Sequence, residues 1–101
     1  MSKNKTVDEF FRSFSVVIIS GASSGIGRAI LSRISNSETK AAVFNLSRTA
    51  PEGVPNSLNF THLTCDLSQP ADIAAVVAEL RKLMPGEGRM LLINNSGFGA
   101  Y

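Results

Sequence analysis

The sequence predicts an α/β fold with an incomplete, doubly wound parallel sheet of four strands in the spatial order 3-2-1-4. Short apolar runs alternate along the chain with segments of helical spacing, the pattern of parallel strands joined by crossovers. A glycine-rich turn stands where the first apolar run gives way to the first of those helical segments. Right-handed crossovers between successive strands then give the predicted order.

The first element is a short helix within residues 1–14, an extension ahead of the sheet. Val7, Phe10, Phe11 and Phe14 have the spacing of one helical face, so we expect them to pack together on the sheet edge. The first strand is expected at residues 15–20. A helix over residues 24–36 follows, with a buried stripe formed by Ile26, Ala29, Ile30 and Ile34.

The second strand, residues 41–46, is apolar apart from Asn45, as expected for a strand covered on both faces. The third strand, residues 58–64, has a more mixed composition. Residues 47–57 lie between them and contain two prolines and a glycine. Such a segment cannot hold several helical turns, so it predicts a short crossover.

The last predicted helix begins at Pro70, because proline suits the first helical position, where an N–H is not needed. It runs through Met84 and is stopped by Pro85 and Gly86. The fourth strand follows at residues 90–93. The buried stripe of this helix is expected to be Ile73, Val76, Val77, Leu80 and Leu83.

Composition excludes several classes of function. The chain has 101 residues and a formal net charge of only +2, so its charge does not indicate a nucleic-acid-binding surface. No apolar stretch approaches the roughly 20 residues needed to span a bilayer, and polar residues follow the charged N-terminus where a signal peptide would be apolar. The single cysteine, Cys65, fits a reducing compartment. We therefore expect a cytoplasmic protein that binds neither nucleic acid nor membranes.

The glycine-rich turn, residues 20–28, carries the strongest chemical signal. Backbone N–H groups at a helix start have no partner within the helix, and the helix dipole favours an anion there. Gly21 lets the chain turn off the strand, Gly25 leaves room for a pyrophosphate, and Gly27 allows close packing. Read alone, the segment is also compatible with an ordinary strand-to-helix turn.

The spacing G-x-x-x-G-x-G differs from that of a P-loop, and no lysine follows it. Together with Asn94-Asn95-Ser96-Gly97 after the fourth apolar run, it resembles the short-chain dehydrogenase/reductase family, which shows T-G-x-x-x-G-[IL]-G and later N-N-A-G. Ser96 replaces the more usual alanine.

The resemblance implies that residues 15–101 are the N-terminal part of a Rossmann-like domain that binds a nicotinamide dinucleotide. The implied activity is that of an oxidoreductase that reduces a carbonyl or oxidises an alcohol. The predicted cofactor-binding residues are Gly21, Ser23, Ser24, Gly25, Ile26, Gly27, Ser47, Arg48, Asp66, Leu67, Asn94, Asn95, Ser96 and Gly97.

Ser47 and Arg48 follow the second strand, about 20 residues beyond the glycines, where an acidic residue would bind the ribose hydroxyls of NAD. No acid stands there. A guanidinium binds a 2′-phosphate with paired charged hydrogen bonds, and a serine hydroxyl can donate another. We therefore predict NADP(H) over NAD(H); the alternative is that Arg48 is a solvated loop residue.

Asp66 and Leu67 resemble the family's adenine-contacting pair, although Asp66 is equally compatible with a turn residue that satisfies backbone donors. No metal site is expected, because His62 has no second histidine, cysteine or carboxylate at ligand spacing. It is read as a partly exposed strand residue. Cys65 is read as small apolar filler, and Arg28 as a solvated helix residue.

Family members that transfer hydride use a Tyr-x-x-x-Lys pair and an upstream serine. Here Tyr101 is the only tyrosine and no lysine follows it, so we expect no catalytic residue and no activity from this chain alone. The apolar fourth strand is expected to be an open edge that exposes Leu91, Leu92 or Ile93, which favours a fragment of a longer enzyme. The alternative is a non-catalytic nucleotide-binding or partner-docking module. Its partner would be another copy of the chain in a homo-oligomer, or the second half of a split domain. A carbonyl or alcohol substrate is expected only in a complete version.

Overall fold

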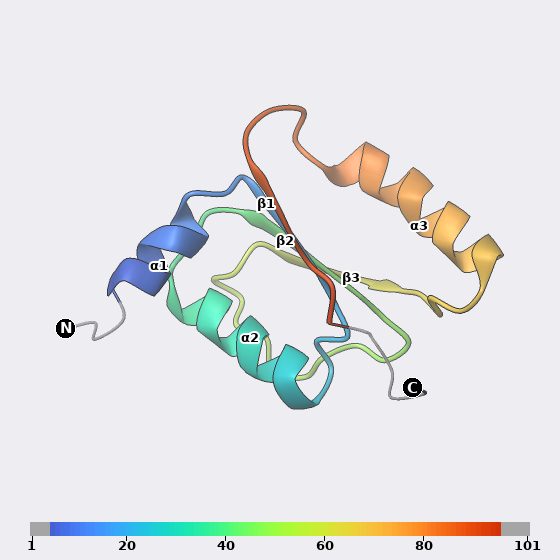
Figure 1. Cartoon of the computed structure of the whole chain (residues 1–101), viewed down its shortest axis with the longest axis horizontal. Helices are drawn as coiled ribbons and strands as arrows, with labels where there is room; N and C mark the ends of the chain where they lie inside the picture. Colours follow the sequence, from blue (N-terminus) through green and yellow to red (C-terminus); the bar gives the residue numbers. More distant parts are fainter. Residues whose placement is uncertain (1–4, 96–101) are drawn as a thin grey trace.

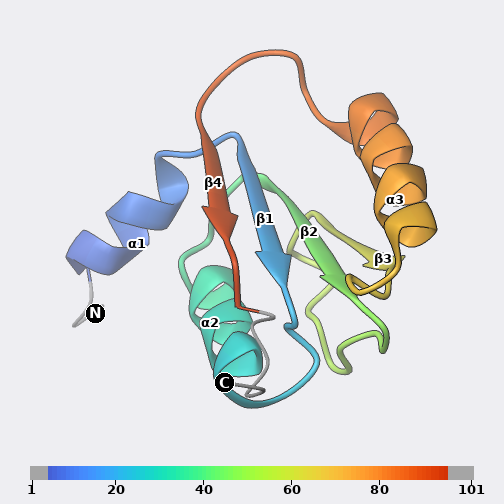
Figure 2. The same cartoon turned by 45° about the vertical axis from the view of Figure 1, so that its right-hand side comes forward.

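The computed structural model describes residues 5–95, which form one four-stranded parallel sheet in the order β3-β2-β1-β4. Figure 2 shows this order across the sheet, with β1 between β4 and β2. All three strand pairs are parallel. The predicted fold class and strand order are therefore confirmed.

The elements lie close to their predicted positions. Their bounds are α1 Lys5–Arg12, β1 Val16–Ser20, α2 Gly25–Asn36, β2 Ala42–Ser47, β3 Phe60–Thr64, α3 Pro70–Leu83 and β4 Met90–Ile93. Pro70 stands at the start of α3, as predicted. The crossover between β2 and β3 contains no helix, because its prolines and Gly53 interrupt helical hydrogen bonding.

The helices form a layer on each face of the sheet (Figure 1). α1 and α2 lie on one face, where Leu31 and Ile34 pack with Val17 and Ile19. α3 lies on the other face, where Val76 and Leu80 pack with Ile18 and Phe44. No helix within residues 5–95 is long and apolar enough to cross a membrane.

The predicted buried face of α2 is partly wrong. Ile34 is buried, but Ile26 is 74% exposed and Ala29 is also exposed, whereas Leu31 is buried. The helix is rotated because Gly27 is its contact point with the preceding turn, and an added Cβ there would overlap the Gly21 carbonyl. The buried face therefore runs through Gly27, Leu31 and Ile34, four and three residues apart.

The stripe predicted for α3 is also only partly buried. Val76 and Leu80 are covered, while Ile73, Val77 and Leu83 are between 41% and 46% exposed. α3 lies against the sheet along a narrow line, so residues on the flanks of its apolar face remain accessible. This helix uses a smaller part of its apolar surface than its sequence offers.

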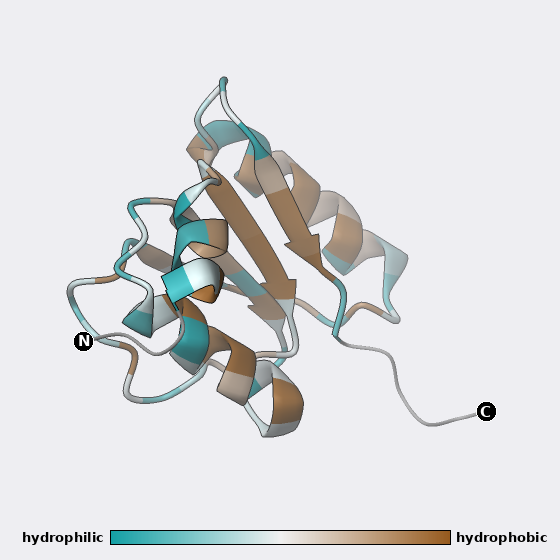
Figure 3. Ribbon diagram, turned by 60° about the vertical axis from the view of Figure 1, so that its left-hand side comes forward, coloured by the Kyte–Doolittle hydropathy of each residue, from teal (hydrophilic) through white to brown (hydrophobic). Residues whose placement is uncertain are grey.

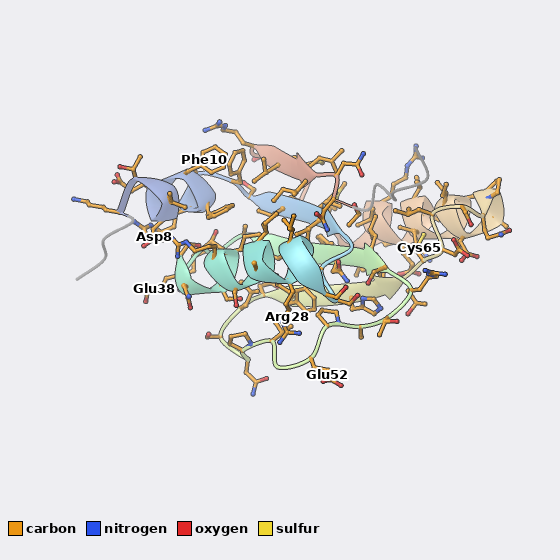
Figure 4. The ribbon with its side chains drawn as sticks, turned by 60° about the horizontal axis from the view of Figure 1, so that its bottom comes forward. Asp8, Phe10, Arg28, Glu38, Glu52 and Cys65 are labelled. Carbon is orange, nitrogen blue, oxygen red and sulfur yellow. The ribbon has the colours of Figure 1, made fainter. Side chains whose placement is uncertain are left out.

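The predicted apolar face of α1 is corrected as well. Phe11 and Phe14 are buried, but Val7 and Phe10 are exposed, and the buried position between them is Asp8. The Asp8 carboxylate accepts a 2.8 Å hydrogen bond from the guanidinium of Arg33 on α2, which fixes the rotation of α1. Figure 4 shows the two sides of the helix, with Asp8 toward α2 and Phe10 away from it.

Candidate functional site

A pocket of about 790 Å³ lies at the carboxyl ends of the strands. This is the edge of a doubly wound sheet at which ligands bind, between strands whose crossovers run in opposite directions. Its volume is within the range of pockets that hold small molecules and cofactors. The lining residues are Gly21, Ser23, Ser24, Ser47, Arg48, Thr49, Cys65, Asp66, Leu67, Ser68 and Asn95.

The glycine-rich turn forms one wall of the pocket and leads into α2. Gly21 and Gly25 have φ angles of 72° and 59°, which residues other than glycine rarely adopt. Nothing lies within 4 Å of the position of a Cβ on Gly25, so its surroundings are open. Ser24 is the N-cap residue of α2 but makes no capping bond with its side chain. The first backbone donors of α2 are therefore left without a side-chain acceptor from the N-cap.

The second motif holds this turn from the side of β4. The Asn95 side-chain amide donates to the Gly21 carbonyl at 3.1 Å, and the Asn95 backbone N–H donates to Ser20 Oγ at 2.9 Å. The Ser20 hydroxyl also contacts Asn94 Oδ1 at 3.4 Å. A Cβ on Gly27 would overlap both the Gly21 carbonyl and the Asn95 amide. The glycine-rich turn and the first two residues of the second motif are therefore one hydrogen-bonded unit in space.

The segment after β2 forms the opposite wall. Arg48 is exposed and lines the pocket, a position that fits both a ligand-binding residue and a solvated loop residue. Ser47 is nearly buried, and its hydroxyl donates to the Thr49 carbonyl at 2.6 Å. The one hydrogen of that hydroxyl thus supports the turn that carries Arg48. In this structure it is therefore not available for the ligand phosphate to which Ser47 is expected to donate.

Asp66 begins the turn after β3 and faces the pocket. Its Oδ1 accepts hydrogen bonds from the Ser68 hydroxyl at 2.6 Å and from the Ser68 N–H at 3.0 Å. These bonds lower the pKa of the Asp66 carboxyl, and the positive charge of Arg48 lowers it further. The turn role considered for Asp66 is therefore present in the structure, and the carboxylate is charged at neutral pH.

Thr49, Cys65 and Ser68 line the pocket but were not predicted to do so. Thr49 directly follows Arg48, and Ser68 directly follows Leu67. This adjacency to predicted site residues is the only signal that the sequence offers. Cys65 lies at the start of the segment leading to α3 (Figure 4), and burial raises the pKa of its thiol, which fits its predicted role as apolar filler.

Four predicted residues lie beside the pocket rather than in its lining: Gly25, Ile26, Gly27 and Asn94. Leu67 lines the pocket and is 38% exposed. Ser96 and Gly97 lie outside the described residues. Among residues 5–95, no three histidine, cysteine or acidic side chains are grouped as metal ligands.

A parallel sheet in this order, with a glycine-rich turn leading into a helix at its carboxyl edge, defines a Rossmann-type α/β protein. The family model for short chain dehydrogenases matches residues 15–100. The chain therefore belongs to the short-chain dehydrogenase/reductase family of oxidoreductases.

Individual relatives agree with this assignment. An uncharacterized oxidoreductase of Saccharomyces cerevisiae, TDA5, is 34% identical over 85 residues, which cover 84% of this chain and 25% of the relative. The ligand-free aldohexose dehydrogenase of Thermoplasma acidophilum is 33% identical with a TM-score of 0.68, over 91% of this chain and 32% of that one. The chain thus spans about a quarter of the curated relative and a third of the solved enzyme.

Two further structures share the fold. A short-chain dehydrogenase/reductase of Burkholderia vietnamiensis is 26% identical with a TM-score of 0.68, over 83% of this chain and 42% of that one. A short chain dehydrogenase of Leptospira borgpetersenii, solved with NAD⁺ bound, is 23% identical with a TM-score of 0.62, over 81% of this chain and 30% of that one.

Proposed function

We propose that this chain is the cofactor-binding N-terminal part of an NADP(H)-dependent oxidoreductase that reduces a carbonyl or oxidises an alcohol. The observation that supports it most directly is the pocket that lies between the glycine-rich turn on one side and Arg48 on the other. One wall offers backbone donors at a helix start, and the other offers a guanidinium. A dinucleotide with an extra phosphate on its adenosine ribose presents anions to both.

The pyrophosphate fits the glycine-rich wall. Ser24 does not cap α2 with its side chain, so the first N–H groups of the helix lack that acceptor, and the space in front of Gly25 is open. An anion placed there gains hydrogen bonds and the favourable end of the helix dipole. We assign Gly21, Ser23 and Ser24 to this group, since all three line the pocket.

The 2′-phosphate fits the opposite wall, where Arg48 is exposed and close enough to Asp66 to lower the pKa of its carboxyl. In the NAD-type arrangement an acid at the end of β2 binds the ribose hydroxyls, and such an acid repels a 2′-phosphate. Here the two residues in that place are Ser47 and Arg48. The guanidinium of Arg48, and the lack of an acid in this place, favour NADP(H).

When bound, the dinucleotide would donate the hydride in carbonyl reduction and accept it in alcohol oxidation. The described residues of this chain bind its phosphates and orient it along the carboxyl edge of the sheet, and we assign them no proton transfer. Asn94 and Asn95 tie β4 to the end of β1 and to the glycine-rich turn, which keeps β1 and β4 in register beside the proposed cofactor position.

The test is titration of the purified chain with NADPH and NADH. We expect Arg48→Ala to weaken NADPH by about 1.5–3 kcal/mol, because charged hydrogen bonds to the 2′-phosphate are lost, and to change NADH little. Arg81→Ala is the control, since it removes the same charge from an exposed position on α3. Equal losses for NADPH and NADH in Arg48→Ala would contradict the assignment of Arg48 to the 2′-phosphate. Absence of binding to both coenzymes by the unmodified chain would contradict the proposed function.

A further inference from the structure

Four polar side chains lie together on the face of the sheet that α2 covers, near the carboxyl ends of β2 and β3. Asn45 pairs in register with His62, and Ser47 pairs with Thr64. We call these four residues the polar quartet. Asn45 is fully buried and stands between two apolar residues of β2, Phe44 and Leu46. A buried amide in the middle of a strand is stable only when its donors and acceptor are all used.

The orientation of the Asn45 amide follows from one contact. Its Oδ1 accepts a 2.9 Å hydrogen bond from the backbone N–H of Ala22, in the glycine-rich turn. A backbone N–H can only donate, so the side of the amide that faces Ala22 must be the oxygen. The nitrogen of the amide then faces the other way and has two hydrogens to donate.

Both hydrogens are used within the quartet. Asn45 Nδ2 lies 2.8 Å from Ser47 Oγ and 3.1 Å from His62 Nδ1. His62 Nδ1 must therefore be an unprotonated acceptor, which leaves the imidazole proton on Nε2, 3.1 Å from Thr64 Oγ1. Ser47 accepts from Asn45 and so directs its own hydrogen to the Thr49 carbonyl. Each donor of Ala22, Asn45, Ser47 and the His62 ring thus has one acceptor.

This chain of hydrogen bonds joins the two walls of the pocket. One end holds Ala22, which is buried between Gly21 and Ser23 of the pyrophosphate wall. The other end holds the turn from Ser47 to Thr49, which carries Arg48. Asn45 and His62 do not line the pocket themselves, so they can influence a ligand only through these two turns.

We propose that Asn45 is a positioning residue that holds the two phosphate-binding turns at a set separation, and that His62, as its acceptor, fixes the orientation of the Asn45 amide. The proposal rests on the proposed function, because it assigns both turns to phosphates of one ligand. It extends that function to two residues behind the site. The expected consequence is that changes at Asn45 or His62 alter the binding of a ligand that neither residue touches.

Two probes separate the walls: 5′-ADP carries the pyrophosphate alone, and 2′,5′-ADP carries a phosphate for each wall. Asn45→Ala removes the acceptor of the Ala22 N–H and the donor to Ser47, so we expect both probes to bind about 5- to 30-fold more weakly. A matched pair at His62 tests orientation. His62→Asn puts an amide oxygen near the place of Nδ1, whereas His62→Leu has a similar bulk and no acceptor. We expect His62→Asn to bind 2′,5′-ADP as the unmodified chain does, and His62→Leu to bind it about fivefold more weakly.

The proton position tests the orientation of the Asn45 amide independently of ligand affinity. Nitrogen-15 NMR of the histidine ring, of which the chain has one, should show the proton on Nε2 at neutral pH. A proton on Nδ1, or equal affinity of His62→Leu and His62→Asn for 2′,5′-ADP, would overturn the proposal. If Asn45→Ala does not fold, the His62 pair and the ring tautomer decide. If the unmodified chain binds neither probe, the proposed function fails with it, whereas normal binding by the unmodified chain and all variants refutes the positioning role alone.

Discussion

β1 and β4 lie side by side and are both mainly apolar, yet they differ in burial. Every residue of β1 is buried, whereas Met90 and Leu92 of β4 are 51% and 65% exposed. Figure 3 shows the two strands next to each other, both coloured as hydrophobic. Their sequences, VVIIS and MLLI, do not forecast this difference. Composition sets how much apolar surface a strand can bury, and its neighbours decide how much is buried.

The cause is that the two helical layers cover different widths of the sheet. On the side of α1 and α2, Leu91 and Ile93 of β4 pack against the same core as Val17 and Ile19. On the other side, α3 covers Ile18 and Phe44, and no described residue covers Leu92, the register partner of Ile18. The predicted exposure at the β4 edge is therefore confirmed for Leu92, and it is confined to the α3 side.

The largest expected effect comes from truncating these register partners. Ile18→Ala should lower the free energy of unfolding by about 2–5 kcal/mol, because it removes a buried side chain and leaves a cavity. Leu92→Ala should change it by less than about 0.5 kcal/mol, because the side chain is already in water. Urea unfolding of both variants measures the two values. Similar losses would mean that Leu92 is covered in solution, for instance by a second copy of the chain.

The link between β1 and β4 at the glycine-rich turn offers a sharper test of the enclosed side. Gly27→Ala should lower the free energy of unfolding by about 1–3 kcal/mol, because the new methyl group overlaps Gly21 and Asn95. Gly86→Ala is the control, since open space surrounds that position, and it should have little effect. Thermal unfolding compares the two. A tolerated Gly27→Ala would show that the turn and β4 are not held together as described.

The smallest effect is the titration of His62, which is partly buried in the polar quartet. Desolvation lowers the pKa of its imidazole, so the folded protein favours the neutral ring more than the unfolded chain does. Between the lowered pKa and the ordinary value of 6.5, the unfolded state binds more protons. Stability should therefore rise with pH across that window, and the contribution should be lost as pH falls through it. His62→Asn should flatten the profile there, and an unchanged profile would assign the slope to other groups.

The strands and connections were predictable because they depend on local properties. Apolar runs, the prolines of the β2–β3 crossover and Pro70 act through backbone geometry that neighbouring residues hardly alter. The predicted strand order follows from the handedness of crossovers, which is common to all chains of this kind. The resemblance carried by the glycine-rich turn and Asn94-Asn95 located the pocket for the same reason, since both motifs sit at strand ends.

The helix faces and the supports of the site could not be predicted in the same way. Helical periodicity allows either Ile26 or Leu31 to belong to the buried face of α2. Only the contact of Gly27 with Gly21 decides which of the two is buried. Asn45 and His62 are far apart in the sequence and meet only through the register of β2 and β3. The donor role of the Asn45 amide and the acceptor role of the His62 ring depend on that contact.

The sequence by itself determined the order of elements, the parallel sheet and the place of the glycine-rich turn and of the turn that carries Arg48, because each follows from short-range backbone preferences and motif spacing. Only the tertiary structure decided which apolar surfaces are covered and where the hydroxyl of Ser47 directs its hydrogen. Both depend on atoms brought together from distant parts of the chain, and a pairing of that kind has no signature in local sequence.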